Sequence, residues 1–123
     1  MRCPSLTLGI VASLAFATST AMAADVEAGK VAFKKCALCH TTEPGKNKIG
    51  PSLFGVVGRK AGTLPGYSFS RAMANSGIVW GPDTLPHYLM GPSSVVPGTK
   101  MTFAGFSNPQ QADDMTAYLA TLK

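Results

Sequence analysis

The pentapeptide CALCH, residues 36–40, constrains this chain more than any other feature, because it places two thiols and an imidazole within five positions. On a helical turn the side chains at positions i, i+3 and i+4 project to the same side. Cys36, Cys39 and His40 can therefore converge on one flat object. Cys-x-x-Cys followed directly by His is the pattern of covalent c-type haem attachment. The motif predicts one covalent haem c, bound through two thioethers, with His40 as a ligand of the iron.

Three other uses of these cysteines fit the sequence less well. A disulfide between positions i and i+3 closes so small a loop that it would add little stability. A zinc ion needs about four ligands, and the chain has only one more histidine, His87, and no second cysteine pair. A thioredoxin-like redox pair requires a βαβ setting, which this sequence does not offer. Haem attachment remains the best interpretation.

The first 23 residues have the features of an export signal. Arg2 precedes an apolar run over residues 6–16, and residues 21–23 (AMA) fit the A-x-A pattern that signal peptidase cleaves. We expect cleavage there and export to the periplasm. The alternative is a membrane anchor made by the uncleaved signal, since residues 6–24 are nearly long enough to span a bilayer, although threonines and serines interrupt them.

The remaining residues, 24–123, are expected to form one monohaem domain. The whole chain has 123 residues, of which 46% are hydrophobic and 14% charged. Such a chain can enclose one compact core but not two ordinary domains. Removing the signal takes away Arg2 and Cys3, which leaves ten basic and six acidic residues, a formal charge of +4 instead of +5. The two cysteines of CALCH are then the only ones left.

Six-coordinate iron needs a further ligand on the haem face opposite His40. The candidates in residues 24–123 are His87, Met73, Met90, Met101 and Met115. Most methionines simply fill gaps in a core, and Met115 lies in a helical pattern that indicates such a role. Met101 follows the Pro-Gly turn of residues 97–100, where irregular backbone can direct a thioether inward. His87 and Tyr88 are adjacent helical positions that point about 100° apart, so His87 faces water if Tyr88 faces the haem. This reasoning favours Met101.

Helices are expected at three places. Asp25 can cap a first helix that leads into the haem motif. Asp83 can cap a short helix that ends at Met90, before Gly91-Pro92. Asn108, followed by proline at the first helical position, can open a last helix that runs almost to the C-terminus. Residues 41–70 carry recurrent glycine and proline without apolar periodicity, which predicts long loops around a buried cofactor.

Several separate motifs carry a resemblance to a known family. CALCH, IGPSLFGVVGRKAG, PGYSF, GIVW and PGTKMTFAG occur in the order and approximate spacing of class I cytochromes c, and most resemble the bacterial cytochrome c2 branch. The similarity covers essentially all of residues 24–123. It implies an all-α cytochrome c fold, with crossed N- and C-terminal helices plus short helices and long loops around a covalently bound haem. Gly29, Phe33 and Tyr118 match the family's contact between the terminal helices.

The resemblance also implies roles for individual residues. By analogy Met101 is the axial thioether, and Pro51 carries the carbonyl that orients His40. Tyr88 and Thr99 are expected near the methionine side of the haem.

Of the residues that the resemblance places near the haem propionates and the neighbouring water network, two match the family and two depart from it. Arg59 and Trp80 match the family's donors to a buried haem propionate. Phe69 stands where many members have a tyrosine that donates to a propionate, and Met73 stands near a polar residue of the haem-side water network. Fewer polar groups beside the iron predict a redox potential on the higher side for this family.

Histidine and methionine ligation determines the expected function. A soft, neutral thioether favours Fe(II), and both axial positions are filled. An enzyme acting on oxygen or peroxide needs an open position and a distal acid or base, and neither is evident in this sequence. We therefore expect no enzyme but a soluble periplasmic electron carrier, between a bc1-type membrane oxidoreductase and an oxidase or photosynthetic reaction centre. The alternative is a haem enzyme or ligand sensor in which a labile Met101 leaves the iron open to peroxide or a diatomic gas.

The basic charge suggests how membrane partners would recognise the carrier. Five lysines flank the haem-binding segments and are expected to surround the exposed haem edge: Lys34, Lys35, Lys46, Lys48 and Lys100. Such a ring would steer acidic patches of redox partners into fast, salt-sensitive encounters. The simpler interpretation is that these lysines only keep the protein soluble. No nucleic-acid motif accompanies the charge, and a monomer without stable membrane insertion is expected.

Overall fold

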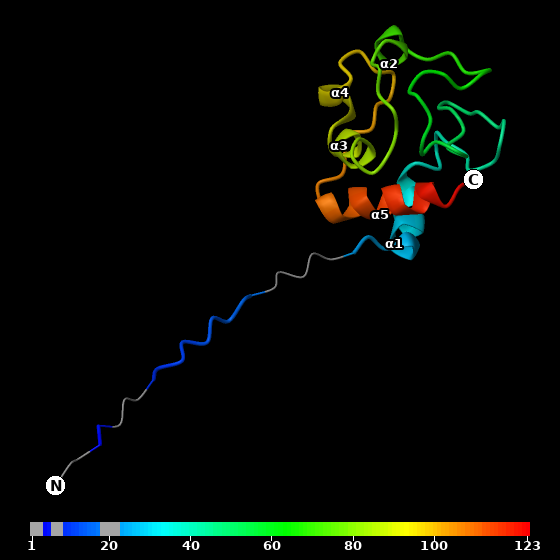
Figure 1. Ribbon diagram of the computed structural model, residues 1–123. Coiled ribbons are helices and arrows are strands. Elements are labelled where there is room, and N and C mark those ends of the chain that lie inside the picture. Colours follow the sequence, from blue (N-terminus) through cyan, green and yellow to red (C-terminus); the bar gives the residue numbers. More distant parts are fainter. Residues whose placement is uncertain (1–3, 6–8, 18–22) are drawn as a thin grey trace.

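The computed structural model describes residues 4–5, 9–17 and 23–123. Much of the predicted signal, including the first two residues of its AMA site, lies outside these residues. The helices are α1 (Val26–Ala32), the short 3-10 helix η1 (Phe33–Lys35), α2 (Arg71–Ala74), α3 (Leu85–Met90), α4 (Pro92–Val95) and α5 (Pro109–Ala120) (Figure 1). In the described part of the chain, extended pairing is limited to one isolated bridge, between Lys60 and Val79. The predicted all-α fold is confirmed.

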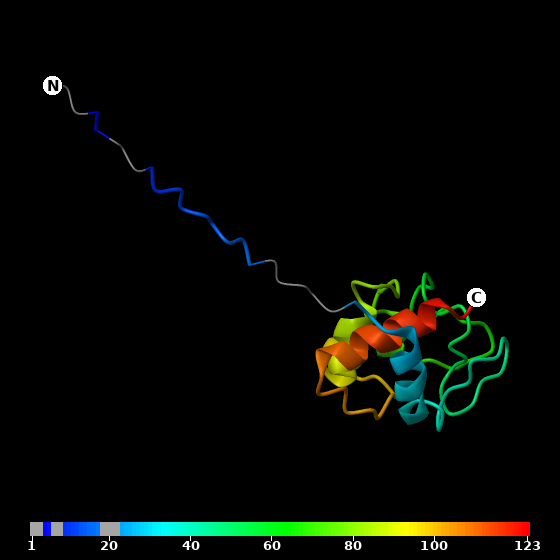
Figure 2. The same ribbon diagram turned by 90° about the horizontal axis from the view of Figure 1, so that it is seen from below.

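The two terminal helices cross, as the resemblance implies (Figures 1 and 2). Gly29 makes the crossing possible, because a Cβ atom at this position would lie 2.0 Å from the carbonyl oxygen of Asp114 and 2.8 Å from Cβ of Tyr118. The ring of Phe33 packs edge-on against that of Tyr118, with centroids 5.7 Å apart. The contact predicted for Gly29, Phe33 and Tyr118 is therefore present.

A buried carboxylate joins the start of α1 to α5. Asp114 is only 7% exposed, and its Oδ1 accepts hydrogen bonds from the amide of Asp25 at 2.8 Å and from Nε2 of Gln110 at 2.9 Å. Because a buried charge is costly unless it is hydrogen-bonded, these two donors account for its place in the interface. The first helix, which carries the haem motif, is thus fixed to the last.

The predicted starts of the terminal helices are confirmed. Asp25 accepts hydrogen bonds from the amides of Glu27 at 2.9 Å and Ala28 at 3.2 Å. Asn108 accepts from the amide of Gln110 at 2.9 Å, with Pro109 at the first helical position. Both are the side-chain caps that satisfy the free amides of a first helical turn.

The predicted start of α3 is wrong by one residue. Thr84, not Asp83, occupies the cap position. Its hydroxyl accepts from the amide of Gly81 at 2.9 Å and donates to the carbonyl of Val79 at 2.7 Å, so it closes the preceding turn instead of capping the helix. The helix ends at Met90, as predicted, and α4 begins directly afterwards with proline at its first position.

One side chain of α5 and one of α3 have the exposure that the sequence predicts. Met115 is fully buried in the core, at 0% exposure, and His87 is exposed. Residues 41–70 contain no helix and no regular strand, and α2 and α4, of four residues each, were not predicted. Among the described residues, no helix has both the length and the apolar character to cross a bilayer.

Candidate functional site

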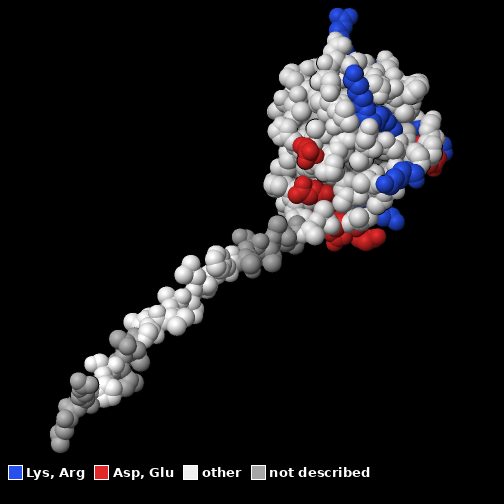
Figure 3. Space-filling view, viewed as in Figure 1, with Lys and Arg blue, Asp and Glu red and all other residues white. Residues whose placement is uncertain are grey.

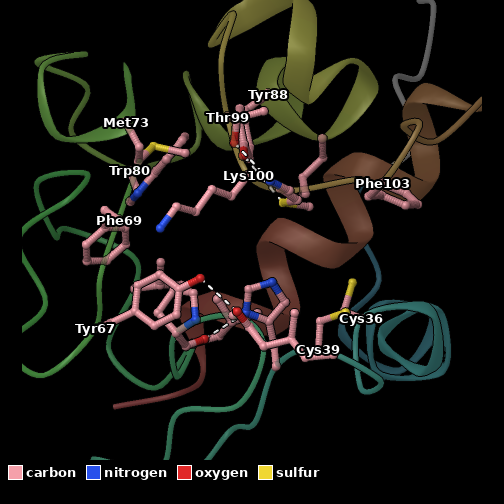
Figure 4. Close-up of a pocket in the computed structure, with 18 of the residues that line it drawn as sticks. Cys36, Cys39, Tyr67, Phe69, Met73, Trp80, Tyr88, Thr99, Lys100 and Phe103 are labelled. Carbon is pink, nitrogen blue, oxygen red and sulfur yellow. Dashed lines mark hydrogen bonds between the residues drawn. The ribbon is translucent and has the colours of Figure 1, made fainter. Parts of the chain in front are cut away.

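A cavity of about 520 Å³ lies between α3, α5 and the loops, and mostly apolar side chains line it. Its volume is typical of small-molecule and cofactor sites. All the predicted site residues line this one cavity: Cys36, Cys39, His40, Pro51, Arg59, Trp80, Tyr88, Thr99 and Met101. Figure 4 shows Cys36 and Cys39 on one side of it, with Tyr88 and Thr99 on the opposite side. Segments far apart in the sequence therefore meet at one site.

The haem motif continues the helical path of α1 and η1. The amide of Ala37 donates to the carbonyl of Phe33 at 3.0 Å, and that of His40 donates to the carbonyl of Cys36 at 2.9 Å. This i to i−4 pattern places both thiols and the imidazole on the cavity wall, as the spacing predicts. Both thiols are free.

Cys36 is a buried, protonated thiol. Burial raises its pKa to about 11, and the neighbouring Cys39 adds to the effect. Within the described residues, no group of three or more His, Cys, Asp or Glu side chains is arranged to hold a metal ion.

The His40 ring is oriented by the carbonyl of Pro51. Nδ1 lies 2.7 Å from that oxygen, and because a carbonyl only accepts, Nδ1 carries the proton and Nε2 keeps its lone pair. Burial lowers the pKa of His40, against the opposing effect of the Pro51 hydrogen bond. The imidazole is therefore neutral at neutral pH, in the tautomer that a metal ion binds through Nε2.

Gly50 leaves no room beside this ring, which gives a testable prediction. A Cβ atom at Gly50 would lie 2.4 Å from Cε1 and 2.7 Å from Nδ1 of His40. Gly50→Ala is expected to push the ring away from the Pro51 carbonyl and to lower the free energy of unfolding by about 1–3 kcal/mol. Thermal unfolding and the visible spectrum of the haem-loaded protein measure the effect. Gly81→Ala is the matched control, because a Cβ at Gly81 meets no atom within 4 Å. Equal stability of the two variants would contradict the steric argument.

The Met101 thioether is held by contacts on the other side of the cavity. The hydroxyl of Tyr88 donates to Sδ of Met101 at 3.4 Å, and the amide of Met101 donates to the hydroxyl of Thr99 at 3.3 Å. Burial raises the pKa of Tyr88, although a hydrogen bond with Thr99 opposes the shift, so the phenol remains a donor. Gly98 precedes this segment with a φ of 90°, a conformation that favours glycine. The tight turn thus brings the sulfur to the cavity.

Arg59 and Trp80 stand close to the position that the resemblance gives them. The guanidinium of Arg59 donates through Nη1 to the carbonyl of Ser52 at 3.2 Å and through Nη2 to that of Phe54. A guanidinium has five N–H donors, so others remain for a carboxylate in the cavity. Trp80 is buried, and its ring centroid lies 4.8 Å from that of Tyr88. Their role toward a propionate stays a prediction.

The structure adds Tyr67, a residue that the sequence reasoning did not assign to the site. Tyr67 lines the cavity, donates its hydroxyl to the carbonyl of Ile49 at 2.7 Å, and packs edge-on against Phe69 with ring centroids 4.7 Å apart. Lys100 extends along the cavity and donates to the carbonyl of Ser68 at 2.9 Å (Figure 4). The PGYSF motif contains Tyr67, but its hydrogen bond joins loops that only the fold brings together.

Comparison with known proteins identifies the family. Residues 26–123 match the family described as Cytochrome c. The chain belongs to the cytochrome c family. This cytochrome c is 56% identical over 88 residues to cytochrome c2 of Rhodopila globiformis, which covers 72% of this chain and 83% of that protein. It is 47% identical over 111 residues to cytochrome c2 of Rhodomicrobium vannielii, with 89% of each chain covered.

A solved structure supports the same assignment. Cytochrome cH from Methylobacterium extorquens shares 49% sequence identity with this cytochrome c, at a TM-score of 0.75 over 79% of this chain and 98% of that chain. The predicted resemblance to class I cytochromes c, and to the c2 branch in particular, is confirmed.

Membership of the family implies a covalently bound c-type haem and electron transport rather than enzymatic catalysis. The residues present fit that group. Two free thiols and a neutral imidazole with an available Nε2 share one turn at an apolar cavity, and a thioether approaches the same cavity from another segment. Electron transport by a covalent haem is therefore consistent with the site.

Proposed function

We propose that this cytochrome c is a periplasmic one-electron carrier in which His40 and Met101 are the two axial ligands of the haem iron. The observation that carries the proposal is the pair of hydrogen bonds that orient these side chains at one cavity. Nδ1 of His40 donates to the carbonyl of Pro51 at 2.7 Å, and the hydroxyl of Tyr88 donates to the sulfur of Met101 at 3.4 Å. When bound, the haem supplies an Fe(III)/Fe(II) couple.

The protein's own residues would let the iron change its oxidation state without exchanging ligands or binding a substrate. Cys36 and Cys39 would hold the haem in place, and His40 and Met101, on two fixed segments, would remain its ligands in both oxidation states. The apolar lining would keep water away from the iron, and with both ligands bound no position would be left for a substrate. These properties suit electron transfer rather than chemistry at the iron.

Membrane redox complexes are the proposed partners, with a bc1-type oxidoreductase as donor and an oxidase or photosynthetic reaction centre as acceptor. The five lysines proposed to dock them are all exposed, and Lys35 and Lys100 line the cavity. Five of the six acidic residues lie in or just before α1, α3 and α5. On the face in Figure 3 the acidic side chains gather mainly toward these helices, and most basic ones lie elsewhere. This separation favours approach by the basic side.

Turnover with host membranes tests the carrier function. The oxidised protein is mixed with membranes of the host supplied with decylubiquinol, and its reduction is followed by visible absorption. A carrier should be reduced by the membranes and reoxidised when oxygen or light is given to them. If the membranes neither reduce nor reoxidise the protein, the proposed function is wrong.

Release of the proposed carrier from the membrane into the periplasm depends on cleavage of the signal after residue 23. The match to the cytochrome c family begins at residue 26, which supports a boundary near this position. Intact-mass spectrometry of the exported protein should show the polypeptide of residues 24–123 plus one haem. A protein that retains residues 1–23 would support the membrane-anchored alternative.

Met73 is proposed to raise the redox potential. Both Met73 and Phe69 line the cavity, where the family commonly has polar groups. Met73→Asn adds a polar group that favours Fe(III), so the midpoint potential should fall by about 40 mV, the one-electron equivalent of a net hydrogen bond of about 1 kcal/mol. Potentiometric titration measures this, with Met73→Leu as the apolar control. A potential that stays constant or rises in Met73→Asn would refute the idea.

A further inference from the structure

The carbonyl that orients His40 belongs to a peptide group that is hydrogen-bonded at both ends. The Pro51 carbonyl accepts from Nδ1 of His40 at 2.7 Å. The N–H of the same peptide group, which is the amide of Ser52, donates to Oδ1 of Asn47 at 2.8 Å. Ser52 is only 1% exposed, so this amide is shielded from water. Asn47 is therefore connected to the proposed iron ligand through a single peptide group.

The side chain of Asn47 extends this series of hydrogen bonds to another loop. Its Nδ2 donates to the carbonyl of Gly66 at 3.3 Å. A backbone amide only donates and a carbonyl only accepts, so both partners require the same orientation of the Asn47 side-chain amide. Three hydrogen bonds therefore run head to tail from Gly66 to His40, through the side-chain amide of Asn47 and the peptide group between Pro51 and Ser52.

Two backbone hydrogen bonds hold this peptide group in place independently of Asn47. The amide of Gly50 donates to the carbonyl of Cys39, the residue before the imidazole ligand, at 2.7 Å. The amide of Leu53 donates to the carbonyl of Thr41, the residue after that ligand, at 2.9 Å. Because these bonds flank both the peptide group and the imidazole, removing the Asn47 side chain should leave their relative position unchanged. What remains for Asn47 is an effect on the strength of the hydrogen bond between them.

Hydrogen bonds that run head to tail through amide groups polarise one another, by about 10–30% per bond. When Asn47 accepts from the N–H end of the peptide group, the carbonyl end becomes a stronger acceptor for Nδ1 of His40. A stronger hydrogen bond at Nδ1 makes Nε2 a more basic metal ligand. A more basic ligand favours Fe(III), because this oxidation state carries the additional positive charge.

We propose that Asn47 acts through the peptide group between Pro51 and Ser52 to strengthen the hydrogen bond of His40, and that it thereby lowers the midpoint potential of the iron. The proposal rests on the function proposed above, in which His40 is an axial ligand. Asn47 does not line the cavity, so it would tune the iron without contacting the haem. Its effect is opposite in sign to the one proposed for Met73.

Asn47→Leu removes the acceptor and tests the proposal in the haem-loaded protein. The equilibrium between Fe(III) and Fe(II) should shift toward Fe(II) by about two- to fourfold, a rise in midpoint potential of roughly 20–35 mV at about 59 mV per tenfold change. In the NMR spectrum of the reduced protein, the signal of the proton on Nδ1 of His40 should move upfield, because its hydrogen bond is weaker. The temperature of unfolding should also fall, because the buried amide of Ser52 loses its acceptor.

Asn47→Asp separates this effect from a simple link between two loops. An aspartate carboxylate keeps an acceptor oxygen for the amide of Ser52 but has no donor for the carbonyl of Gly66. The proton signal of His40 should therefore stay at its wild-type position or move downfield. If Asn47 served only to join the loops, Asn47→Asp would shift the signal upfield as Asn47→Leu does, and that result would overturn the proposal.

Thr41→Val is the matched control. The hydroxyl of Thr41 donates to the carbonyl of Lys46 at 2.5 Å, so its loss weakens the same loop without touching the three hydrogen bonds from Gly66 to His40. This variant should keep the wild-type potential and the wild-type proton signal of His40.

Two results would overturn the proposal: Asn47→Leu keeps the wild-type potential and proton signal, or Thr41→Val changes both as much as Asn47→Leu does. The spectrum of the wild-type protein distinguishes a failure of the underlying function. If the oxidised wild-type protein lacks the absorption band of sulfur bound to Fe(III), the proposed ligation is wrong. If the band is present and Asn47→Leu has no effect, only the role of Asn47 is rejected.

Discussion

A double variant in which Cys36 and Cys39 are replaced by serine is expected to lose covalently bound haem completely. A thioether needs the sulfur of cysteine, and a serine hydroxyl does not replace it. Both thiols lie on the wall of the cavity. A helical turn holds them there, in which the amide of His40 donates a hydrogen bond to the carbonyl of Cys36 at 2.9 Å. Denaturing electrophoresis with haem staining, together with the intact mass, should show a colourless polypeptide.

The same variant should also be strongly destabilised. Without the group that fills it, a cavity of about 520 Å³ lined mostly by apolar side chains would leave that apolar surface to water, which is costly for a domain whose total stability is typically about 5–15 kcal/mol. We expect circular dichroism to show little helix in the haem-free chain. Single variants of Cys36 or Cys39 are the controls, because each keeps one thioether. Covalent haem in the double variant would contradict the assignment of both attachment residues.

Met101→Leu is expected to lower the midpoint potential on the order of 0.2 V, within the roughly 0.8 V over which axial ligands set haem potentials. Leucine conserves the volume of methionine, so packing should change little, but it provides no lone pair to the iron and no acceptor for the hydroxyl of Tyr88. The weak absorption band at the edge of the near infrared, which arises when sulfur is bound to Fe(III), should disappear. Potentiometric titration and the oxidised spectrum measure both effects.

Met115→Leu provides the comparison for this prediction. Met115 also lines the cavity but is fully buried in the core, at 0% exposure. Its replacement should leave both the potential and the band at their wild-type values. If Met101→Leu keeps the wild-type potential and band, another side chain is the ligand, with Met73 as the next methionine at the cavity.

Local patterns in the sequence were enough to predict the elements whose chemistry is local. The spacing of CALCH predicts a turn that gathers its three side chains, and Asp25 and Asn108 cap the helices that they precede. The Pro-Gly turn before Met101 already favours this residue as the second ligand. The role of Pro51 came only from the resemblance to cytochromes c, because residues far apart in the sequence cannot be paired by periodicity. The hydrogen bond from His40 to Pro51 agrees with that expectation.

The elements that the sequence did not predict correctly have physical explanations. The helices α2 and α4 span four residues each, which is too short for an apolar period to appear. Asp83 and Thr84 are both good capping residues, and the choice depends on the turn that Thr84 makes with Gly81 and Val79.

A redox titration of the exported protein, followed through its visible and near-infrared absorption, tests the central claim most directly. Ligation of the iron by His40 and Met101 predicts a single reversible one-electron transition, with the sulfur-to-iron band present in the oxidised form and absent from the reduced form. An oxidised protein without this band, whose spectrum changes when peroxide or a diatomic gas is added, would have an open iron site. That result would contradict a carrier and support the haem enzyme or ligand sensor instead.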